Sequence, residues 1–338
     1  MSRASGEAMR RREFIQFLGG AAVAWPLAAR AQPSNPVRLV GGLFGLAEND
    51  SEVQARVAAF RHQLADLGWV EGNNIRFEFR FFGSDSIAAR TFAADLVRLA
   101  PDVIWTQTVL ALDAIWQTTR TIPVVFINVA DPVGSGYVAS LSRPGGNFTG
   151  FTNFEYTIGS RWLQILKDIA PAVTRVAIVY SPETQAYAAF LPEIERVARS
   201  FGVRVTEAGV YDDAAEIERV ITEHGREPDG GLIVLPHSIT TKYRKLIIDL
   251  TSKHRLPAIY PYRYFAAEGG LISYGVDGVH LSRQAASYVD LILKGSKPGD
   301  LPVQQPTKFE LVVNLKTAKA LGLSISDAFL LRTDEVIE

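Results

Sequence analysis

Polar side chains follow several short apolar runs of this chain, and they are the residues best suited to bind a small molecule. Thr106, Gln107 and Thr108 come directly after the apolar run 103–105 and precede a helical pattern. Their hydroxyl groups, together with backbone N–H groups at the start of a helix, can hold a carboxylate. Thr106 or Thr108 can also cap that helix, and one residue can serve both purposes.

Two further polar residues, Asn128 and Asp131, follow the apolar run 122–127. The carboxylate of Asp131 can bind a ligand amine. The pair Asp131-Pro132 is also typical of a turn, and the turn is the interpretation that we favour.

The second half of the chain offers a similar set of residues at the ends of its apolar runs. Tyr260 lies close to Tyr262 and Tyr264, and such a cluster can stack on a planar ligand or pack at the protein surface. The predicted ligand-binding residues of both halves are Phe44, Thr106, Gln107, Thr108, Asn128, Asp131, Ser181, Tyr187, His237 and Tyr260.

The motifs that catalysis or a cofactor would require are missing. The chain has no cysteine, which excludes disulfides, iron–sulfur clusters, thiol nucleophiles and thiolate zinc sites. It has no G-x-S-x-G elbow and no P-loop lysine motif, and the glycines of 41–45 lack the third glycine of a dinucleotide-binding loop. His237 alone among the histidines follows a predicted strand, and one histidine makes a poor metal site. We therefore predict a protein that is not an enzyme and holds no cofactor or metal.

Strand and helix patterns alternate along the chain and occur in the same order in both halves. In the first half, Val53, Val57, Phe60 and Leu64 recur at helical spacing before Gly68. Similar dipeptides occur at corresponding places in the two halves. Phe201-Gly202 corresponds to Leu67-Gly68, and Pro228-Asp229 corresponds to Pro101-Asp102. The predicted strands are 37–43, 75–81, 103–105, 122–127, 176–180, 203–205, 231–235 and 256–260, and the predicted helices include 88–99, 110–118, 190–201, 214–223 and 239–254.

This alternation favours an α/β fold with two doubly wound lobes and parallel sheets. A further helix over 281–292, a strand over 309–313 and a helix over 315–321 follow the second copy. We expect three crossings, near 151–153, 274–278 and 306–309, which would form a three-strand hinge. Lobe one then comprises residues 37–150 plus 278–305, and lobe two comprises 153–273 plus 308–338. A ligand would lie between them, at the carboxyl ends of the strands.

Two segments carry a resemblance to a known family. Residues 131–136 (DPVGSG) with 142–150 (SRPGGNFTG), and residues 301–307 (LPVQQPT) with 314–318 (NLKTA), resemble signatures of a family of ABC-transporter substrate-binding proteins. Its better-understood members bind tryptophan or related amino acids. The resemblance covers essentially the whole chain after the first 31 residues. It implies a type I periplasmic binding fold, in which two lobes close on a small solute.

The resemblance implies a periplasmic, monomeric solute-binding component that delivers its ligand to an ABC permease in the inner membrane. The ligand would be aromatic or amino-acid-like, with branched aliphatic solutes as an alternative. Tryptophan-binding relatives carry an Asn-Ser-x-Glu-x-Asn-Ser-like loop where this chain has residues 181–187 (SPETQAY), so an amino-acid ligand does not follow directly. A sensing subunit for a membrane receptor and an exported enzyme are the alternative functions.

The first 31 residues have the layout of a cleaved export signal. Arg11-Arg12 is followed by Phe14-Ile15, an apolar stretch and the small residues Ala29 and Ala31. This order is typical of secretory signals, and the paired arginines resemble a twin-arginine signal. The alternative is an amphipathic helix, which the glycines and Pro26 disfavour. Translation starts at Met1 or Met9.

Composition agrees with an exported protein that has no lipid anchor and no nucleic-acid partner. The chain has 338 residues, a hydrophobic fraction of 47% and a formal net charge of −1. A near-neutral chain lacks the basic surface that nucleic acids or anionic membranes attract. Without a cysteine at the cleavage site, no lipid can be attached there.

We predict that exchange of Arg11 and Arg12 for lysine abolishes export, because the twin-arginine route recognises both guanidinium groups. The measurement is the fraction of the chain recovered outside the cytoplasm, compared with a variant in which Arg10 is exchanged for lysine. Undiminished export of the doubly exchanged chain would argue against this route.

Overall fold

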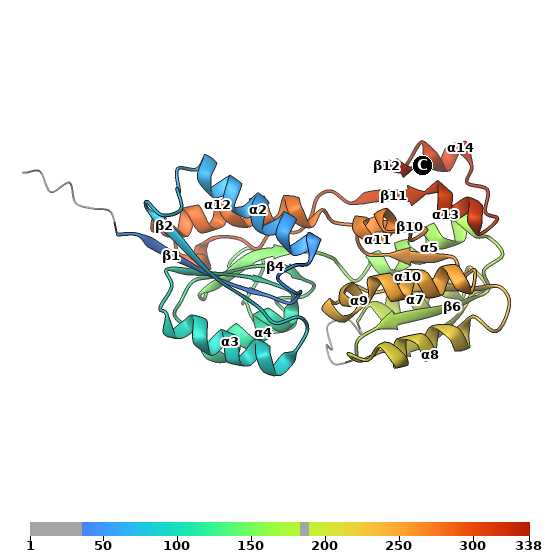
Figure 1. Cartoon of the computed structure of the whole chain (residues 1–338), viewed down its shortest axis with the longest axis horizontal. Coiled ribbons are helices and arrows are strands. Elements are labelled where there is room, and N and C mark those ends of the chain that lie inside the picture. Colours follow the sequence, from blue (N-terminus) through green and yellow to red (C-terminus); the bar gives the residue numbers. More distant parts are fainter. Residues whose placement is uncertain (1–35, 183–188) are drawn as a thin grey trace, which may run out of the picture. The chain divides into compact units, whose positions relative to one another are not determined.

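The computed structural model describes residues 36–182 and 189–338, and the predicted leader lies outside these residues. The described chain contains two β-sheets (Figure 1). The first has the order β2-β1-β3-β4-β5 and the second the order β12-β11-β10-β9-β8-β6-β7. The prediction of an α/β fold with two parallel-sheet lobes is confirmed.

The strands of the first sheet are all parallel. Helices α2 and α12 pack together on one face of this sheet, and helices α3 and α4 pack together on the other. The elements are β1 (Arg38–Phe44), α2 (Ser51–Asp66), β2 (Ile75–Phe81), α3 (Ser86–Arg98), β3 (Val103–Gln107), α4 (Val109–Thr118), β4 (Val124–Val129), β5 (Phe148–Thr152), α12 (Gly278–Leu293) and η1 (Pro298–Asp300).

The second sheet is built from the same alternation of strands and helices as the first, but strands β11 and β12 extend it at one edge. Helices α5 and α7 pack together, as do α8 and α10. The elements are α5 (Ile158–Ile169), β6 (Arg175–Tyr180), α7 (Phe190–Ala198), β7 (Arg204–Gly209), α8 (Ala214–His224), β8 (Gly230–Val234), α9 (Ser238–Lys242), α10 (Arg244–Lys253), β9 (Ala258–Tyr260), α11 (Arg263–Ala267), β10 (Ile272–Gly275), β11 (Glu310–Asn314), α13 (Leu315–Ala320), α14 (Asp327–Leu330) and β12 (Glu335–Ile337).

Local sequence signals explain most of these boundaries. Asp50 caps α2 by accepting a hydrogen bond from the backbone N–H of Glu52 at 2.9 Å, and Gly68 follows the helix with a φ of 94°. Asp85 caps α3 in the same way. Side-chain caps of this kind satisfy N–H groups that a helix start leaves unpaired. The interior strands are buried along their length, as expected for strands covered on both faces.

Three features differ from the predictions. The segment predicted as one helix over 239–254 forms two helices, α9 and α10, which meet at Tyr243. Helices α5, α11 and α14 and strands β5, β10 and β12 were not predicted. Strand β11 pairs antiparallel with β10, because it enters the sheet after a passage through the first lobe and so runs in the opposite direction.

The chain passes between the two sheets at three places. These are the segments between β5 and α5, between β10 and α12, and between η1 and β11. The first and third run together, since Thr152 donates its backbone N–H to the carbonyl of Gln304 at 2.9 Å. The lobe boundaries predicted from the sequence remain a prediction. In the described part of the chain, no helix is long and apolar enough to span a membrane.

Candidate functional site

Each sheet has one point at which the winding of the chain reverses. In the first sheet β1 lies between β2 and β3, so the connections after β1 and β3 leave in opposite directions. The second sheet reverses in the same way between β6 and β8. In open α/β sheets, ligands bind outside the carboxyl ends of the strands at such a point. Phe44 and Gln107 end β1 and β3, while Ser181 and His237 follow β6 and β8.

The backbone of the first lobe is strained at this edge. Thr108, directly after β3, has φ 85° and ψ 154°, a region that non-glycine residues rarely occupy. Ser84 after β2 and Asn128 near the end of β4 also have positive φ values, 75° and 59°. Asparagine tolerates this conformation better than threonine or serine. Strain of this kind collects at ligand sites, where the surrounding structure maintains it.

Three of the predicted residues in the first lobe are buried with polar atoms that lack partners. Thr106, Gln107 and Asn128 expose 0%, 2% and 4% of their surface. Within the described residues, Thr106 Oγ1, Gln107 Nε2 and Asn128 Oδ1 make no hydrogen bond. A buried polar group without a partner costs about 1–3 kcal/mol, so such groups need an explanation. A bound solute would supply the missing partners.

The second lobe shows the same feature at its own reversal point. Ser181 is fully buried, and its hydroxyl has no partner among the residues that the structure describes. Ser238, at the start of α9, is 3% exposed and its hydroxyl is also unpaired in that part of the chain; it follows the predicted strand 231–235 but is not among the predicted ligand-binding residues. Asn153, on the first crossing, has an unpaired Oδ1 by the same criterion. The predicted site residue Tyr187 lies outside the described residues.

Two of the predicted residues have roles within the local fold. Thr108 caps α4, because its Oγ1 accepts the backbone N–H of Ala111 at 3.4 Å. Asp131 accepts the backbone N–H of Gly134 at 2.8 Å, which is the turn that we favoured. Its other oxygen accepts the hydroxyl of Tyr156 at 3.3 Å, which connects this turn to the segment leading into α5.

The two aromatic residues Phe44 and Tyr260 lie in the cores of the lobes. The ring of Phe44 makes an edge contact with Trp105, with centroids 5.0 Å apart. Tyr260 is fully buried, stacks on Phe265, and its hydroxyl lies 3.0 Å from that of Thr251. Both rings therefore pack within the core, and the Tyr260 hydroxyl has a polar partner without a ligand.

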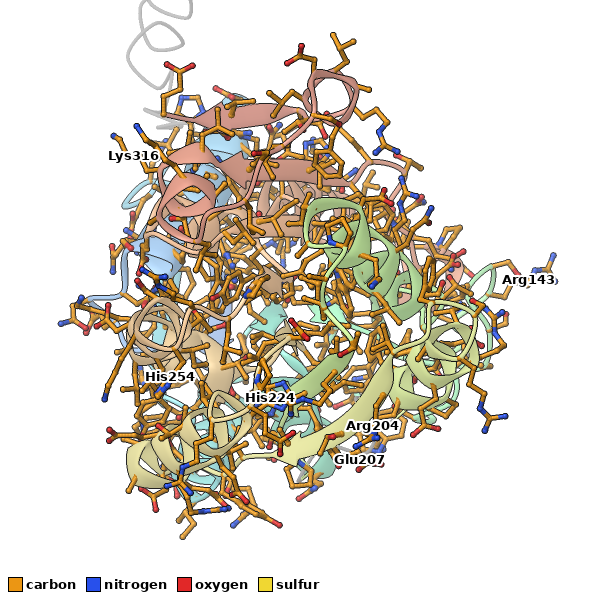
Figure 2. All side chains as sticks on the ribbon, turned by 90° about the vertical axis from the view of Figure 1, so that its right-hand side faces the viewer. Arg143, Arg204, Glu207, His224, His254 and Lys316 are labelled. Atoms are coloured by element: carbon orange, nitrogen blue, oxygen red, sulfur yellow. The ribbon has the colours of Figure 1, made fainter. Side chains whose placement is uncertain are left out.

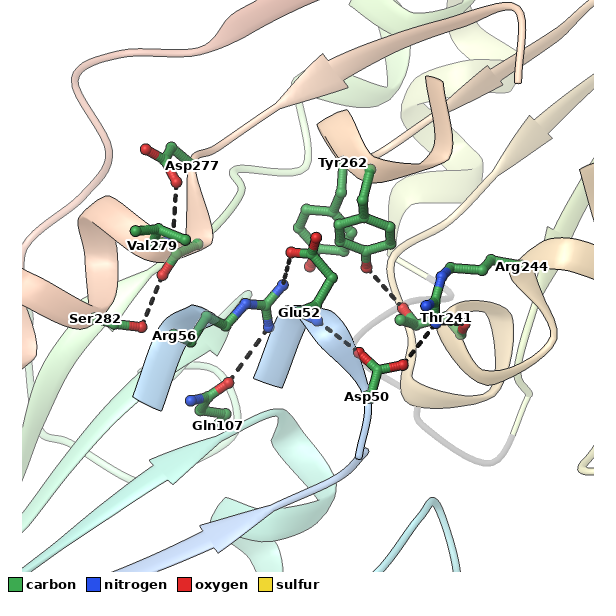
Figure 3. Close-up of polar contacts among 12 residues, drawn as sticks. Asp50, Glu52, Arg56, Gln107, Thr241, Arg244, Tyr262, Asp277, Val279 and Ser282 are labelled. Atoms are coloured by element: carbon green, nitrogen blue, oxygen red, sulfur yellow. Dashed lines mark hydrogen bonds and ion pairs between the residues drawn. The ribbon is translucent and has the colours of Figure 1, made fainter. Parts of the chain in front are cut away.

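Arg56 on α2 is a residue of this region that the sequence analysis missed. Its guanidinium donates from Nη1 to Gln107 Oε1 at 3.3 Å, and its Nη2 lies 3.9 Å from Glu52 Oε2 (Figure 3). Only 4% of Arg56 is exposed. A signal was present, because Arg56 stands three residues after Val53 and four before Phe60, on the apolar face of the helix. A cation on such a face needs a specific partner.

Tyrosines of the second lobe reach the same region. The hydroxyl of Tyr262 accepts a hydrogen bond from Asn153 Nδ2 at 3.3 Å, and its ring centroid lies 6.0 Å from the Arg56 guanidinium carbon. Tyr264 stacks on Tyr262, and its hydroxyl lies 2.9 Å from that of Thr241. Of the predicted tyrosine cluster, Tyr262 and Tyr264 therefore approach the candidate site, whereas Tyr260 does not.

An ion pair and a hydrogen bond join the loops of the two lobes around this region. Arg244, at the start of α10, donates from Nη1 to Asp50 Oδ2 at 2.7 Å (Figure 3). Its Nε donates to Glu268 Oε1 at 2.7 Å. Ser84 donates to Asp212, which also pairs with Lys242 at 2.7 Å. Both contacts connect residues beyond the carboxyl ends of strands, so these edges of the two sheets face each other.

A second polar region lies within lobe two, on strands β6 and β7 and helix α8. It is a hollow of about 400 Å³ whose lining includes Arg204, Glu207 and His224 (Figure 2). Its charges are largely paired, since Arg175 lies 3.4 Å from Glu227 and the Tyr180 hydroxyl donates to Glu207 at 2.7 Å. Paired charges at an open surface make this hollow a weaker candidate.

His237 caps α9 as a neutral imidazole. Its Nδ1 accepts the backbone N–H of Ile239 at 3.2 Å, and the backbone N–H of His237 donates to Thr240 Oγ1 at 3.1 Å. Burial lowers the pKa of His237 to about 4, against a smaller opposing effect of Asp212. At neutral pH the side chain is therefore a polar group without charge. Among the described residues, no group of three His, Asp or Glu side chains could hold a metal ion.

Comparison with known proteins gives consistent results. Residues 46–337 match a family model described as ABC transporter substrate binding protein. A tyrosine-binding protein of Clostridioides difficile is 25% identical over 297 residues, which cover 87% of this chain and 85% of that protein.

Solved structures with the same fold include an ABC domain from Streptococcus pneumonia in complex with L-Trp. It has a TM-score of 0.82 and 22% identity, and the match covers 89% of this chain and 99% of that one. A conserved domain protein from Vibrio cholerae has a TM-score of 0.82 and 25% identity, with the same coverage.

We predict that His237 makes the protein less stable in mild acid. The unfolded chain binds a proton on this histidine below its ordinary pKa of 6.5, whereas the folded chain binds it only below about 4. The free energy of unfolding should therefore fall as the pH drops from 6.5 to 4, by up to about 3 kcal/mol from this group.

The measurement is urea unfolding at pH 7, 6, 5 and 4 for the natural chain and for His237→Asn. Asparagine can still cap α9 but does not titrate in this range. The variant should lose less stability between pH 6.5 and 4. Identical pH profiles of the two proteins would contradict the prediction.

Proposed function

The chain belongs to the ABC transporter substrate binding protein family, and on this basis we propose that it is the periplasmic solute-binding component of an ABC importer. One observation carries the proposal. Buried polar atoms without partners lie at the reversal points of both sheets, and contacts such as Arg244–Asp50 bring these two edges together. A small solute between the lobes would satisfy groups from both sides.

The proposed mechanism is closure of two lobes about the three connecting segments. Each lobe has its own sheet and its own covering helices, whereas the connections between them are short. A solute held by one lobe would favour the arrangement in which the other lobe also contacts it. The closed form would then be the one that the permease in the inner membrane recognises.

The proposed ligand is an aromatic or amino-acid-like molecule. The tyrosine-binding and L-Trp-bound relatives support this class. So do Tyr262 and Tyr264, whose stacked rings lie beside the buried polar atoms of Asn153 and Arg56. Stacking on a planar group would add to the hydrogen bonds in selecting such a ligand.

We expect a thermal-shift screen of the full chain against amino acids, aromatic acids, nucleosides and sugars to identify one class that raises the Tm. A solute present at one hundred times its Kd stabilises the folded form by about 2.7 kcal/mol, which is readily measured. We expect the shift from aromatic acids or amino acids. A shift from sugars or nucleosides alone would refute the ligand class, and no shift from any class would argue against a solute-binding function.

The ion pair between Arg244 and Asp50 provides a test of closure. Its side chains are only 14% and 12% exposed, and it joins the two lobes. If it stabilises the closed form, Asp50→Asn and Arg244→Gln should each weaken binding of the solute found in the screen about threefold to thirtyfold. Asparagine retains the cap of α2, so the helix itself should be preserved.

The matched control is Arg263→Gln, which breaks a pair of similar length within the second lobe. Arg263 Nη2 lies 2.6 Å from Glu335 Oε1. Isothermal titration should give an unchanged Kd for this control. Equal effects of the control and the two test variants would indicate a general loss of stability instead of a loss of closure.

A further inference from the structure

The buried guanidinium of Arg56 has an incomplete set of partners. It projects from the first turns of α2 and is 4% exposed. Its Nη1 donates to Gln107, its Nη2 is beyond hydrogen-bond distance from Glu52, and its Nε has no partner among the described residues. A guanidinium offers five N–H donors, and leaving donors of a buried cation unpaired is costly.

The partner of Arg56 has a free donor as well. Gln107 is 2% exposed, and its Nε2 makes no hydrogen bond within residues 36–182 and 189–338. Gln107 ends β3, one residue before the strained Thr108 and next to the reversal point of the first sheet. Arg56 and Gln107 therefore lie side by side, and each retains a buried donor, Nε of Arg56 and Nε2 of Gln107, without an acceptor in the described residues.

Other charges nearby leave room for one negative charge. Arg244 is paired with Asp50 and Glu268, and Lys242 is paired with Asp212. Glu52 is the acidic group paired with Arg56, but its Oε2 lies 3.9 Å from Nη2, which is beyond hydrogen-bond distance, so it leaves the guanidinium donors unpaired. A doubly charged oxyanion would need a second free cation in this cluster. A singly charged, planar group with two acceptor oxygens fits the guanidinium best.

We propose that Arg56 and Gln107 bind the carboxylate of the solute, so that the ligand is a small organic acid. This inference rests on the proposed solute-binding function and adds to it the chemical group that is recognised. Gly278 approaches the guanidinium so closely that a Cβ there would lie 2.7 Å from Arg56 Nε, so the glycine leaves the side chain in this position.

The test compares acids with their neutral amides on the full chain. The pairs are 4-hydroxyphenylacetate and its amide, L-tyrosine and L-tyrosinamide, and isovalerate and its amide. For pairs that bind, we expect isothermal titration to give an acid at least about tenfold tighter than its amide. Arg56→Gln should remove the preference for the acid. Arg56→Lys should retain only part of this preference, because an ammonium group lacks the planar pair of N–H donors with which a guanidinium binds both carboxylate oxygens. Equal affinities of acid and amide, or a preference that survives Arg56→Gln, would overturn the proposal.

The control is Arg61→Gln, on the same helix. Arg61 is 43% exposed in its side chain and lies 3.6 Å from Glu71, so its loss should leave the acid preference unchanged. Inorganic phosphate serves as the competing probe. Stronger stabilisation by phosphate than by the acids would refute a carboxylate site.

A second readout does not require a bound solute and separates the two proposals. If Arg56 is present to bind the ligand, the double variant that combines Glu52→Gln with Arg56→Gln should have a Tm equal to or above that of the natural chain. The reason is that this variant removes a buried charge with too few partners. If Arg56 serves the fold, the Tm should fall by several degrees, which would overturn the inference. If no acid or amide binds, the proposed function is refuted for these solutes. An unchanged Tm of the double variant would in that case still show that Arg56 is not required for the fold.

Discussion

A parallel sheet places the carboxyl ends of all its strands at one edge, and the candidate site depends on this constraint. Each return of the chain must cross a face of the sheet, so helices cover both faces and the edges remain for loops. Because β1 and β3 are neighbours with connections that leave in opposite directions, Phe44 and Gln107 end beside one another. The second sheet repeats this arrangement at β6 and β8. Two such edges that face each other provide polar groups from two directions.

Several buried polar groups without partners gather at the candidate site, and each of them carries an energetic cost. Thr106, Gln107 and Ser181 are almost completely buried, and each has an atom without a partner in the described part of the chain. Other buried hydroxyls are paired, as in the Thr251–Tyr260 and Thr241–Tyr264 contacts, whereas the unpaired atoms of Thr222, His254 and Ser273 are scattered over different elements of lobe two. A protein with a marginal free energy of unfolding does not retain several unsatisfied groups at one edge without a compensating function.

The sequence predicted the lobes and most strands because their signals are local. A buried run such as 124–127, or a helix ending before Gly68, can be recognised from its own residues. The strand ends could be predicted for the same reason, so Gln107, Asn128 and Ser181 were correctly placed at or just after strand ends, while their role in binding stays a prediction. Arg56 was missed because its significance depends on Gln107, which lies fifty-one residues away in the sequence. The antiparallel direction of β11 depends on the path of the whole chain. The break at Tyr243 within the predicted helix 239–254 has no strong sequence signal such as glycine or proline.

The position of α12 has a consequence for synthesis of the chain. This helix packs against α2 and contributes Leu281, Ala285 and Val289 to the core of the first lobe, although it follows nearly all of the second lobe in the sequence. Trp69 in the first lobe also depends on α12 for its partner, since its indole N–H donates to Asp290 at 2.8 Å. As the ribosome extends the chain from its N-terminus, the first lobe therefore keeps an apolar helix face uncovered until residue 293 has emerged. The lobe that begins first is completed late, and a nascent chain of this protein has a long interval in which chaperones can act on it.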